Sequence, residues 1–247
     1  MFNKSKKKTK ERGVHLITDE KNFSIIEAYK AIRANINFAV TSPGCKKIMV
    51  CSSYSGEGKT TTCVNLAVTI AQTGASVLLI DADMRKPRIH NFLNINNETG
   101  LSGYLSNMTS LNSVIKDTDI HNLKVITSGI IPPNPAELLA SPKMEKLFGE
   151  VEGVTDYIII DTPPVCIVSD VLPLSKICDG VILIVSHMET LHPQIKEALE
   201  KLHFAGANVI GMILNKVKIN HASKYYSKYG KYKYYQEYKE NTDTPDD

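Results

Sequence analysis

Six short apolar runs, separated by segments long enough for helices, constrain the fold more than any other feature of this sequence. The runs are continuously apolar and do not alternate with polar residues, which is typical of strands covered on both faces. They occupy residues 47–51, 77–80, 124–126, 157–160, 181–185 and 209–214. Helix-length segments lie between them, for example 59–73, 135–148 and 193–204. This alternation predicts an α/β fold of three layers, with helices on both faces of a mainly parallel central sheet and right-handed crossovers.

Two helix starts can be predicted from their capping residues. Ser24 followed by Glu27 fits a capping box, in which each side chain bonds the other residue's backbone N–H. An apolar stripe at helical spacing then follows, made of Ile25, Tyr29, Ile32 and Ile36. Asn134 and Pro135 fit the N-cap and first position of a second helix.

The distribution of charge and apolar residues predicts three zones. Residues 1–22 are polar and basic, with a net charge of +5 over residues 1–12. The strand and helix segments lie within 23–220, whereas 221–247 contain no Leu, Ile, Val, Met or Phe and bury too little apolar surface to order themselves. We therefore expect a basic flexible arm over 1–22, one folded domain over 23–220 and a mobile tail over 221–247. The arm is either a solvated segment or one attracted to an anionic membrane face or an acidic partner.

Several classes of protein are disfavoured by the same composition. No apolar run approaches the ~20 residues that cross a bilayer, and the basic N-terminus lacks the apolar stretch of a signal peptide. The five cysteines are scattered without close pairs, which favours a reducing compartment over a disulfide framework or a zinc site. We expect a cytoplasmic protein.

Residues 53–61 read Ser-Tyr-Ser-Gly-Glu-Gly-Lys-Thr-Thr and resemble a P-loop, with Ser53 where the general pattern has glycine. Glycines let successive backbone N–H groups curl around phosphates, and the following helix adds its positive end. Lys59 would bridge the terminal phosphates and the Thr60 hydroxyl would reach Mg²⁺. The loop predicts a P-loop NTPase-like fold. Its expected nucleotide-binding residues are Ser55, Gly56, Glu57, Gly58, Lys59, Thr60 and Thr61.

Acidic residues follow two further strands at the point where each run ends. The run 77–80 leads into Asp81 and Asp83, and the run 157–160 leads into Asp161. Carboxyl ends of parallel strands meet at one edge of a sheet, so these carboxylates should lie beside the P-loop. Mg²⁺ would offset their charge next to a triphosphate. For any one of them, a helix N-cap or turn role is the alternative.

Together, the P-loop, Asp-Ala-Asp-Met-Arg at 81–85 and Asp-Thr-Pro-Pro at 161–164 resemble the bacterial tyrosine kinases of capsule and exopolysaccharide synthesis. In that family the three motifs are called Walker A, A′ and B. The resemblance spans nearly the whole chain, including 129–139 and 169–180. The chain is similar to the form of these kinases in which the cytosolic kinase is a separate polypeptide from its membrane-bound modulator. Partition and septum-placing ATPases of the broader class have lysine where Tyr54 stands. The family loop often has proline where Ser55 stands.

The resemblance implies an ATP- and Mg²⁺-dependent protein-tyrosine kinase and assigns its site residues. Lys59, Asp81 and Asp83 are the expected catalytic residues, with Asp81 orienting the tyrosyl hydroxyl. Thr60, Asp81 and Asp161 are the expected metal ligands, and Asn215 could bond the adenine edge, with a turn role as its alternative. Ring assembly in the family uses a Glu-x-x-Arg-x-x-Arg pattern, which reads Glu27, Lys30 and Arg33 here. Lysine lacks the bidentate fork of arginine, so we expect assembly of altered strength.

Seven of the 11 tyrosines gather within residues 225–238, interleaved with lysines. Composition alone favours either a low-complexity solvated end or a basic aromatic strip that stacks nucleic-acid bases. The resemblance implies instead that the tail is the kinase's own substrate, phosphorylated in trans, so we expect no nucleic-acid partner. The candidate acceptors are Tyr225, Tyr226, Tyr229, Tyr232, Tyr234, Tyr235 and Tyr238. Phosphorylation of all seven would add roughly −10 to −14 charges and should dissolve an assembly built on tail docking.

Further partners follow from the resemblance: a homo-oligomeric ring, a membrane-bound co-polymerase-type activator that recruits the kinase to the inner membrane face, and a phosphotyrosine phosphatase. Two other functions compete with the kinase. One is a nucleotide-driven assembly switch of the ParA/MinD type, whose tail serves only as an interaction strip. The other is an iron–sulfur reductase of related fold, for which Cys166 and Cys178 do not supply a clear cysteine pair.

Overall fold

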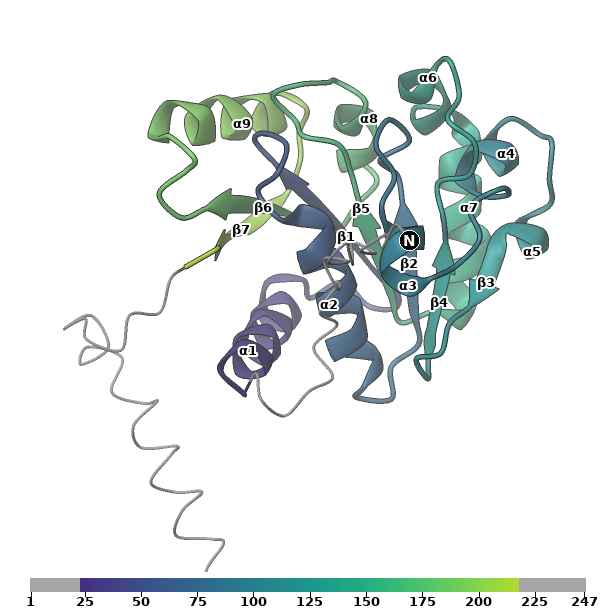
Figure 1. Cartoon of the computed structure of the whole chain (residues 1–247), viewed down its shortest axis with the longest axis horizontal. Coiled ribbons are helices and arrows are strands. Elements are labelled where there is room, and N and C mark those ends of the chain that lie inside the picture. The colour runs from purple at the N-terminus through teal and green to yellow at the C-terminus, as the bar shows by residue number, and fades with distance from the viewer. Residues whose placement is uncertain (1–22, 218–247) are drawn as a thin grey trace, which may run out of the picture. The chain divides into compact units, whose positions relative to one another are not determined.

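A computed structural model describes residues 23–217 and shows one seven-stranded sheet in the order β3-β4-β2-β5-β1-β6-β7 (Figure 1). All neighbouring strands pair in parallel except β3 and β4, which are antiparallel. The strands are β1 (Lys46–Ser52), β2 (Val77–Asp81), β3 (Ile115–Asp117), β4 (Leu123–Ile126), β5 (Tyr157–Asp161), β6 (Gly180–Ser186) and β7 (Val209–Asn215). The mainly parallel sheet and all six expected strands are confirmed, and β3 is an addition.

Helices cover both faces of this sheet, which confirms the three-layer α/β/α architecture (Figure 1). On one face lie α1 (Phe23–Ala39), α2 (Lys59–Ala71) and α3 (Ile89–Leu93). The other face carries α4 (Leu101–Leu105), α5 (Leu111–Val114), α6 (Pro135–Leu139), α7 (Pro142–Val151), α8 (Val171–Ser175) and α9 (His192–Phe204). A short 3₁₀ turn, η2 (Glu152–Val154), follows α7.

Each central strand feeds both hydrophobic layers because successive side chains point to opposite faces. In β1, Ile48 and Val50 pack with α1 and α2, while Met49 and Cys51 belong to the layer beneath α7 and α9. Both faces of the central strands are therefore apolar, which explains why the sequence shows continuous apolar runs without polar alternation. The expectation of cover on both faces is wrong for β7, because it is an edge strand in which Met212 and Leu214 are 57% and 55% exposed.

The parallel register brings the carboxyl ends of β2, β5 and β1 together. Asp81 at the end of β2 pairs in register with Asp161 at the end of β5. Asp161 is in turn the partner of Val50 in β1, just before the P-loop. Two acids predicted from separate motifs thus end on adjacent strands.

The expected capping box at the first helix is wrong. Helix α1 begins at Phe23, so Ser24 lies inside the first turn, and the Glu27 carboxylate accepts a hydrogen bond from Lys30 Nζ at 2.7 Å. The apolar stripe holds along most of the helix: Ile36 is fully buried, whereas Ile25 is 44% exposed.

The expected helix at 135–148 is two helices, α6 and α7, divided before Pro142. Proline lacks a backbone N–H and pushes the preceding residue out of the helical region, so Ser141 is extended and Pro142 opens α7. Asn134 does precede Pro135 at the start of α6, but its amide donates to the Glu137 carboxylate at 2.6 Å and caps no backbone N–H.

Within residues 23–217, none of the helices has the length and apolar character required to cross a lipid bilayer. The basic arm at 1–22 and the tail with its seven candidate tyrosines lie outside the described residues.

Candidate active site

The P-loop turns sharply between β1 and α2, as its sequence predicts. Gly56 and Gly58 have φ of +90° and +95°, in the left-handed region that residues with a Cβ disfavour. Gly58 is the residue just before α2, so Lys59 and Thr60 occupy the first turn of that 13-residue helix. The positive end of α2 therefore faces the edge of the sheet where the strands finish.

Glu57 fixes the loop from behind. Its carboxylate accepts hydrogen bonds from the Tyr54 backbone N–H (3.1 Å) and from the Thr190 hydroxyl, and the residue is buried. Its backbone carbonyl accepts from the Asn215 side-chain amide at 2.9 Å. These bonds tie the P-loop to the loop after β6 and to the end of β7, so the Glu57 side chain supports the loop rather than facing the cavity.

Lys59 lies between two of the expected acids. Its Nζ is 2.9 Å from Asp83 Oδ2 and 4.0 Å from Asp161 Oδ1. Burial lowers the pKa of Lys59, but the charges of Asp161 and Asp83 outweigh burial and raise the pKa above its ordinary value. Lys59 is therefore a firmly charged ammonium group placed where incoming phosphates would replace the carboxylates as its partners.

Asp81 is buried and already well bonded. Its Oδ1 accepts the backbone N–H of Asp83 (3.2 Å), and its Oδ2 accepts those of Arg88 and Ile89 (both 3.1 Å). Burial and the charge of Asp161 raise the pKa of Asp81 well above its usual range. The carboxylate thus anchors the loop after β2 and the start of α3.

Asp161 is buried and lacks the partners that Asp81 has. Neither of its oxygens has a hydrogen-bond donor of normal geometry among the described residues. Burial raises its pKa to about 6, although Lys59 and the Thr60 hydroxyl act in the opposite direction. An unpartnered buried carboxylate beside a threonine hydroxyl fits a Mg²⁺ ion that completes its shell with phosphate and water. No group of three or more His, Cys, Asp or Glu side chains within residues 23–217 could hold a metal alone, so the nucleotide would have to share in its coordination.

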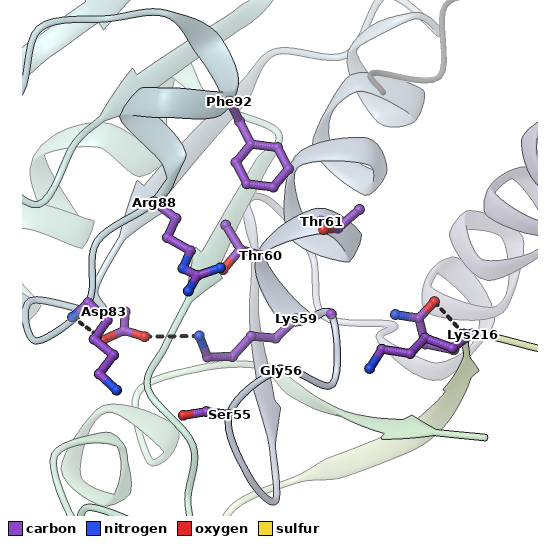
Figure 2. Close-up of a pocket in the computed structure, with 12 residues that line it drawn as sticks. Ser55, Gly56, Lys59, Thr60, Thr61, Asp83, Arg88, Phe92 and Lys216 are labelled. Atoms are coloured by element: carbon purple, nitrogen blue, oxygen red, sulfur yellow. Dashed lines mark hydrogen bonds and ion pairs between the residues drawn. The ribbon is translucent and has the colours of Figure 1, made fainter. Parts of the chain in front are cut away.

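A cavity of about 460 Å³ opens at the edge of the sheet where the P-loop lies (Figure 2). It brings together most of the predicted site residues with several that the sequence did not single out. The predicted members of its lining are Ser55, Gly56, Gly58, Lys59, Thr60, Thr61, Asp83 and Asn215; the others are Lys86, Arg88, Phe92 and Lys216. Lys86 and Arg88 could have been suspected from their nearness to Asp83, and Lys216 from its place next to Asn215 after the last strand, but Phe92 carries no sequence signal.

Asn215 reaches the cavity, but both ends of its amide are engaged. Nδ2 donates to the Glu57 carbonyl, and Oδ1 accepts the backbone N–H of Lys216 at 2.8 Å. One amide hydrogen remains for a ligand, so its contact with adenine stays a prediction.

The residues expected at a subunit interface lie on α1 with partners in the same chain. Lys30 pairs with Glu27, and Arg33 donates to the Thr69 carbonyl in α2 at 3.2 Å. Their role in assembly stays a prediction.

Comparison with known proteins adds to this geometry. The family model described as an AAA domain, AAA_31, matches residues 45–203. The chain is 40% identical to the tyrosine-protein kinase YwqD of Bacillus subtilis, over 87% of this chain and 90% of that protein. It is 38% identical to the putative tyrosine-protein kinase CapB of Staphylococcus aureus, over 87% and 94%. Among solved structures it is similar to the kinase domain of the Escherichia coli tyrosine kinase ETK, with a TM-score of 0.80, 34% identity and coverage of 84% and 82%.

Proposed function

This chain belongs to the AAA_31 family and, within it, to the bacterial tyrosine-protein kinases, and we propose from that premise that it phosphorylates the tyrosines of its own residues 225–238 in trans. The donor is ATP, used with Mg²⁺. The observation that carries the proposal is the placement of Lys59, 2.9 Å from Asp83 and 4.0 Å from Asp161 at the mouth of the P-loop cavity.

Lys59 and the first turn of α2 bind the β- and γ-phosphates. Phosphoryl transfer passes through a loose transition state, so orientation and neutralisation of charge contribute more than a strong base. Lys59 exchanges its carboxylate partners for phosphate oxygens and stays charged throughout, because its pKa is raised. Backbone N–H groups of the loop around Gly56 and Gly58 add neutral donors.

Thr60 and Asp161 would hold the Mg²⁺ ion, with Asp81 directly behind them on the neighbouring strand. When bound, the ion supplies charge neutralisation at the phosphates. The support for Asp161 in this role is that its oxygens have no other hydrogen-bond partner among the described residues.

A carboxylate beside the cavity accepts the tyrosyl proton as the new P–O bond forms. Two residues are candidates. Asp81 is the residue chosen from the sequence, with Asp83 in support, whereas in the structure Asp83 lines the cavity and contacts Lys59. Substituting each by asparagine separates them: loss of kcat with retained ATP affinity identifies the proton acceptor.

We place this reaction in a homo-oligomeric ring that a membrane-bound co-polymerase-type activator recruits to the inner membrane face. The resemblance to the capsule and exopolysaccharide kinases supports that placement. It also supports a role in polysaccharide production and a phosphatase that restores the tail. Since residues 221–240 carry a net charge of +3, several phosphates would reverse the charge of the tail and disassemble the ring. Native mass spectrometry of phosphorylated and dephosphorylated samples tests this, and equal subunit numbers would contradict it.

A mixing experiment tests transfer in trans. One partner is the full chain with Lys59→Ala, which keeps the tyrosines; the other is an active chain truncated after Asn220, which lacks them. With radiolabelled ATP, Mg²⁺ and the activator's cytosolic segment, we expect label on the Lys59→Ala chain only in the mixture. Intact-mass measurement of the Lys59→Ala chain should show stepwise increases, each equal to the mass of one phosphoryl group. The Lys59→Ala chain alone is the control.

The competing assembly switch gives a different result. It would release labelled inorganic phosphate and leave both chains unlabelled. Truncation after Asn220 would not change the rate at which phosphate is released. That outcome would refute the tail as substrate.

A further inference from the structure

Arg88 is a cation at the start of α3 that the mechanism above does not use. We propose that Arg88 is a further catalytic residue, whose guanidinium binds the γ-phosphoryl oxygens as the phosphoryl group moves to tyrosine. The proposal rests on the proposed binding of ATP in the P-loop cavity, and it is argued from where the main chain places the side chain and from what the side chain leaves unpaired.

The main chain of Arg88 is held by the site itself. Its backbone N–H and that of Ile89 both donate to Asp81 Oδ2 at 3.1 Å. Asp81 ends β2 beside Asp161, so the start of α3 is fastened to the same strand ends that carry the acids. The origin of the Arg88 side chain is therefore fixed relative to the P-loop.

The side chain extends from this point toward Thr60, in the first turn of α2 that also carries Lys59 (Figure 2). It lines the same cavity as both residues, and its charge is one of the influences that lower the pKa of Asp161. The guanidinium thus lies within electrostatic reach of the groups expected around the terminal phosphate.

The guanidinium of Arg88 has no ion-pair partner among residues 23–217, in contrast to that of Arg85 three residues earlier. Arg85 binds both carboxylate oxygens of the buried Asp170, through Nε at 2.6 Å and Nη2 at 3.0 Å. Across residues 23–217, no carboxylate forms such an ion pair with Arg88, and its side chain is exposed to the cavity mouth. An anionic ligand would be the first ion-pair partner of this guanidinium among the groups that the structure describes.

Phosphoryl transfer needs a donor of this shape. The bond from the γ-phosphorus to the β–γ bridging oxygen breaks while the bond to the tyrosyl oxygen forms, the phenolic proton passes to a carboxylate, and ADP leaves. Charge is spread over the three peripheral oxygens in between. Lys59 offers a point charge, whereas a guanidinium offers parallel N–H groups that can bind two of those oxygens together.

The test compares Arg88→Ala and Arg88→Lys with Lys86→Ala in the full chain. Lys86→Ala removes the same unit charge from the lining of the same cavity. Two quantities are measured: kcat of phosphate incorporation, and the dissociation constants of Mg-ADP with and without fluoroaluminate, which mimics the phosphoryl group in flight.

We expect Arg88→Ala to lower kcat about 100-fold. Fluoroaluminate should strengthen the binding of Mg-ADP in the wild-type chain, and Arg88→Ala should reduce that gain by a similar factor. ADP affinity alone should change less than about threefold, because ADP lacks the γ-phosphoryl oxygens. Arg88→Lys should restore kcat to no more than about a tenth of the wild-type value, and Lys86→Ala should lower kcat at least about tenfold less than Arg88→Ala does.

Equal losses in Arg88→Ala and Lys86→Ala would reduce the effect to the general field of the cavity and overturn the assignment, as would unchanged fluoroaluminate affinity in Arg88→Ala. If the wild-type chain places no phosphate on its tyrosines, the proposed substrate fails. The fluoroaluminate comparison still decides the role of Arg88, because it requires only nucleotide binding.

Discussion

Asp161→Asn should stabilise the nucleotide-free protein while weakening its response to Mg²⁺. The carboxylate is 1% exposed and has no hydrogen-bond donor of normal geometry among the described residues. Burial raises its pKa from 3.8 to about 6, against the opposing effects of Lys59 and the Thr60 hydroxyl. A shift of about two units corresponds to about 3 kcal/mol at pH 7. Asparagine removes that cost but buries an amide, at about 1 kcal/mol. We therefore expect the free energy of unfolding to rise by about 2 kcal/mol.

The dependence on pH identifies the cause. A raised pKa means that the native state binds the proton more tightly than the unfolded chain, so between about pH 4 and pH 6 the native state carries more protons. Stability then falls as the pH rises through that window, and the full cost of the charge is present at pH 7. The advantage of Asp161→Asn should therefore be large at pH 7.5 and small at pH 4.5.

Urea denaturation followed by far-UV circular dichroism measures this, since the sequence contains no tryptophan. The matched control is Asp170→Asn, at an aspartate that is 2% exposed but has both oxygens bonded to Arg85. Asp170→Asn should lower the free energy of unfolding by about 1–2 kcal/mol. The same change from aspartate to asparagine would thus stabilise the protein at one buried site and destabilise it at the other. A destabilised Asp161→Asn at pH 7.5 without Mg²⁺, or a gain equal at both pH values, would refute the reasoning.

Two further outcomes test the P-loop's supports. A methyl group at Gly58 would collide with the Asn215 amide, whereas one at Gly56 meets open space at a similar positive φ. Gly58→Ala should lose about 1 kcal/mol more of the free energy of unfolding than Gly56→Ala in urea, and Asn215→Ala should erase the difference. Thr190→Val removes the hydroxyl that bonds Glu57, and we expect calorimetry to show ADP bound several-fold more weakly; unchanged affinity would show that this bond does not hold the loop.

Much of the fold could be predicted because its main signals are local. Each central strand is an unbroken apolar run, and each proved to be buried on both faces. The edge strand β3 gave no such signal, since it has three residues and pairs on one side only with β4. The division before Pro142 was visible as a proline, but the apolar residues around it continue across the break at near-helical spacing, and the periodicity hid the end of α6.

The site divides in the same way. The P-loop and the three acids follow directly from strands, so their meeting could be inferred from parallel pairing alone. Side-chain contacts between residues far apart in the sequence could not be inferred in this way. Arg85 and Asp170 stand 85 residues apart, and Thr190 stands 133 residues from Glu57. Nothing in the local sequence of these residues signals the partner, because side-chain pairing across a fold depends on the packing of the intervening elements.

The three acids at the strand ends differ in the hydrogen-bond and ion-pair partners that they already have. This difference predicts how each of them should respond when a nucleotide binds. Asp81 holds three backbone N–H groups, Asp83 holds Lys59 and the Lys86 backbone N–H, and Asp161 has no hydrogen-bond donor among the described residues. A cation arriving with the phosphates therefore gains most at Asp161. Phosphates that draw Lys59 away leave Asp83 with an oxygen free of its ion pair. The nucleotide would thus both satisfy one acid and release another, and the released carboxylate is the one that faces the cavity where a phenol would enter.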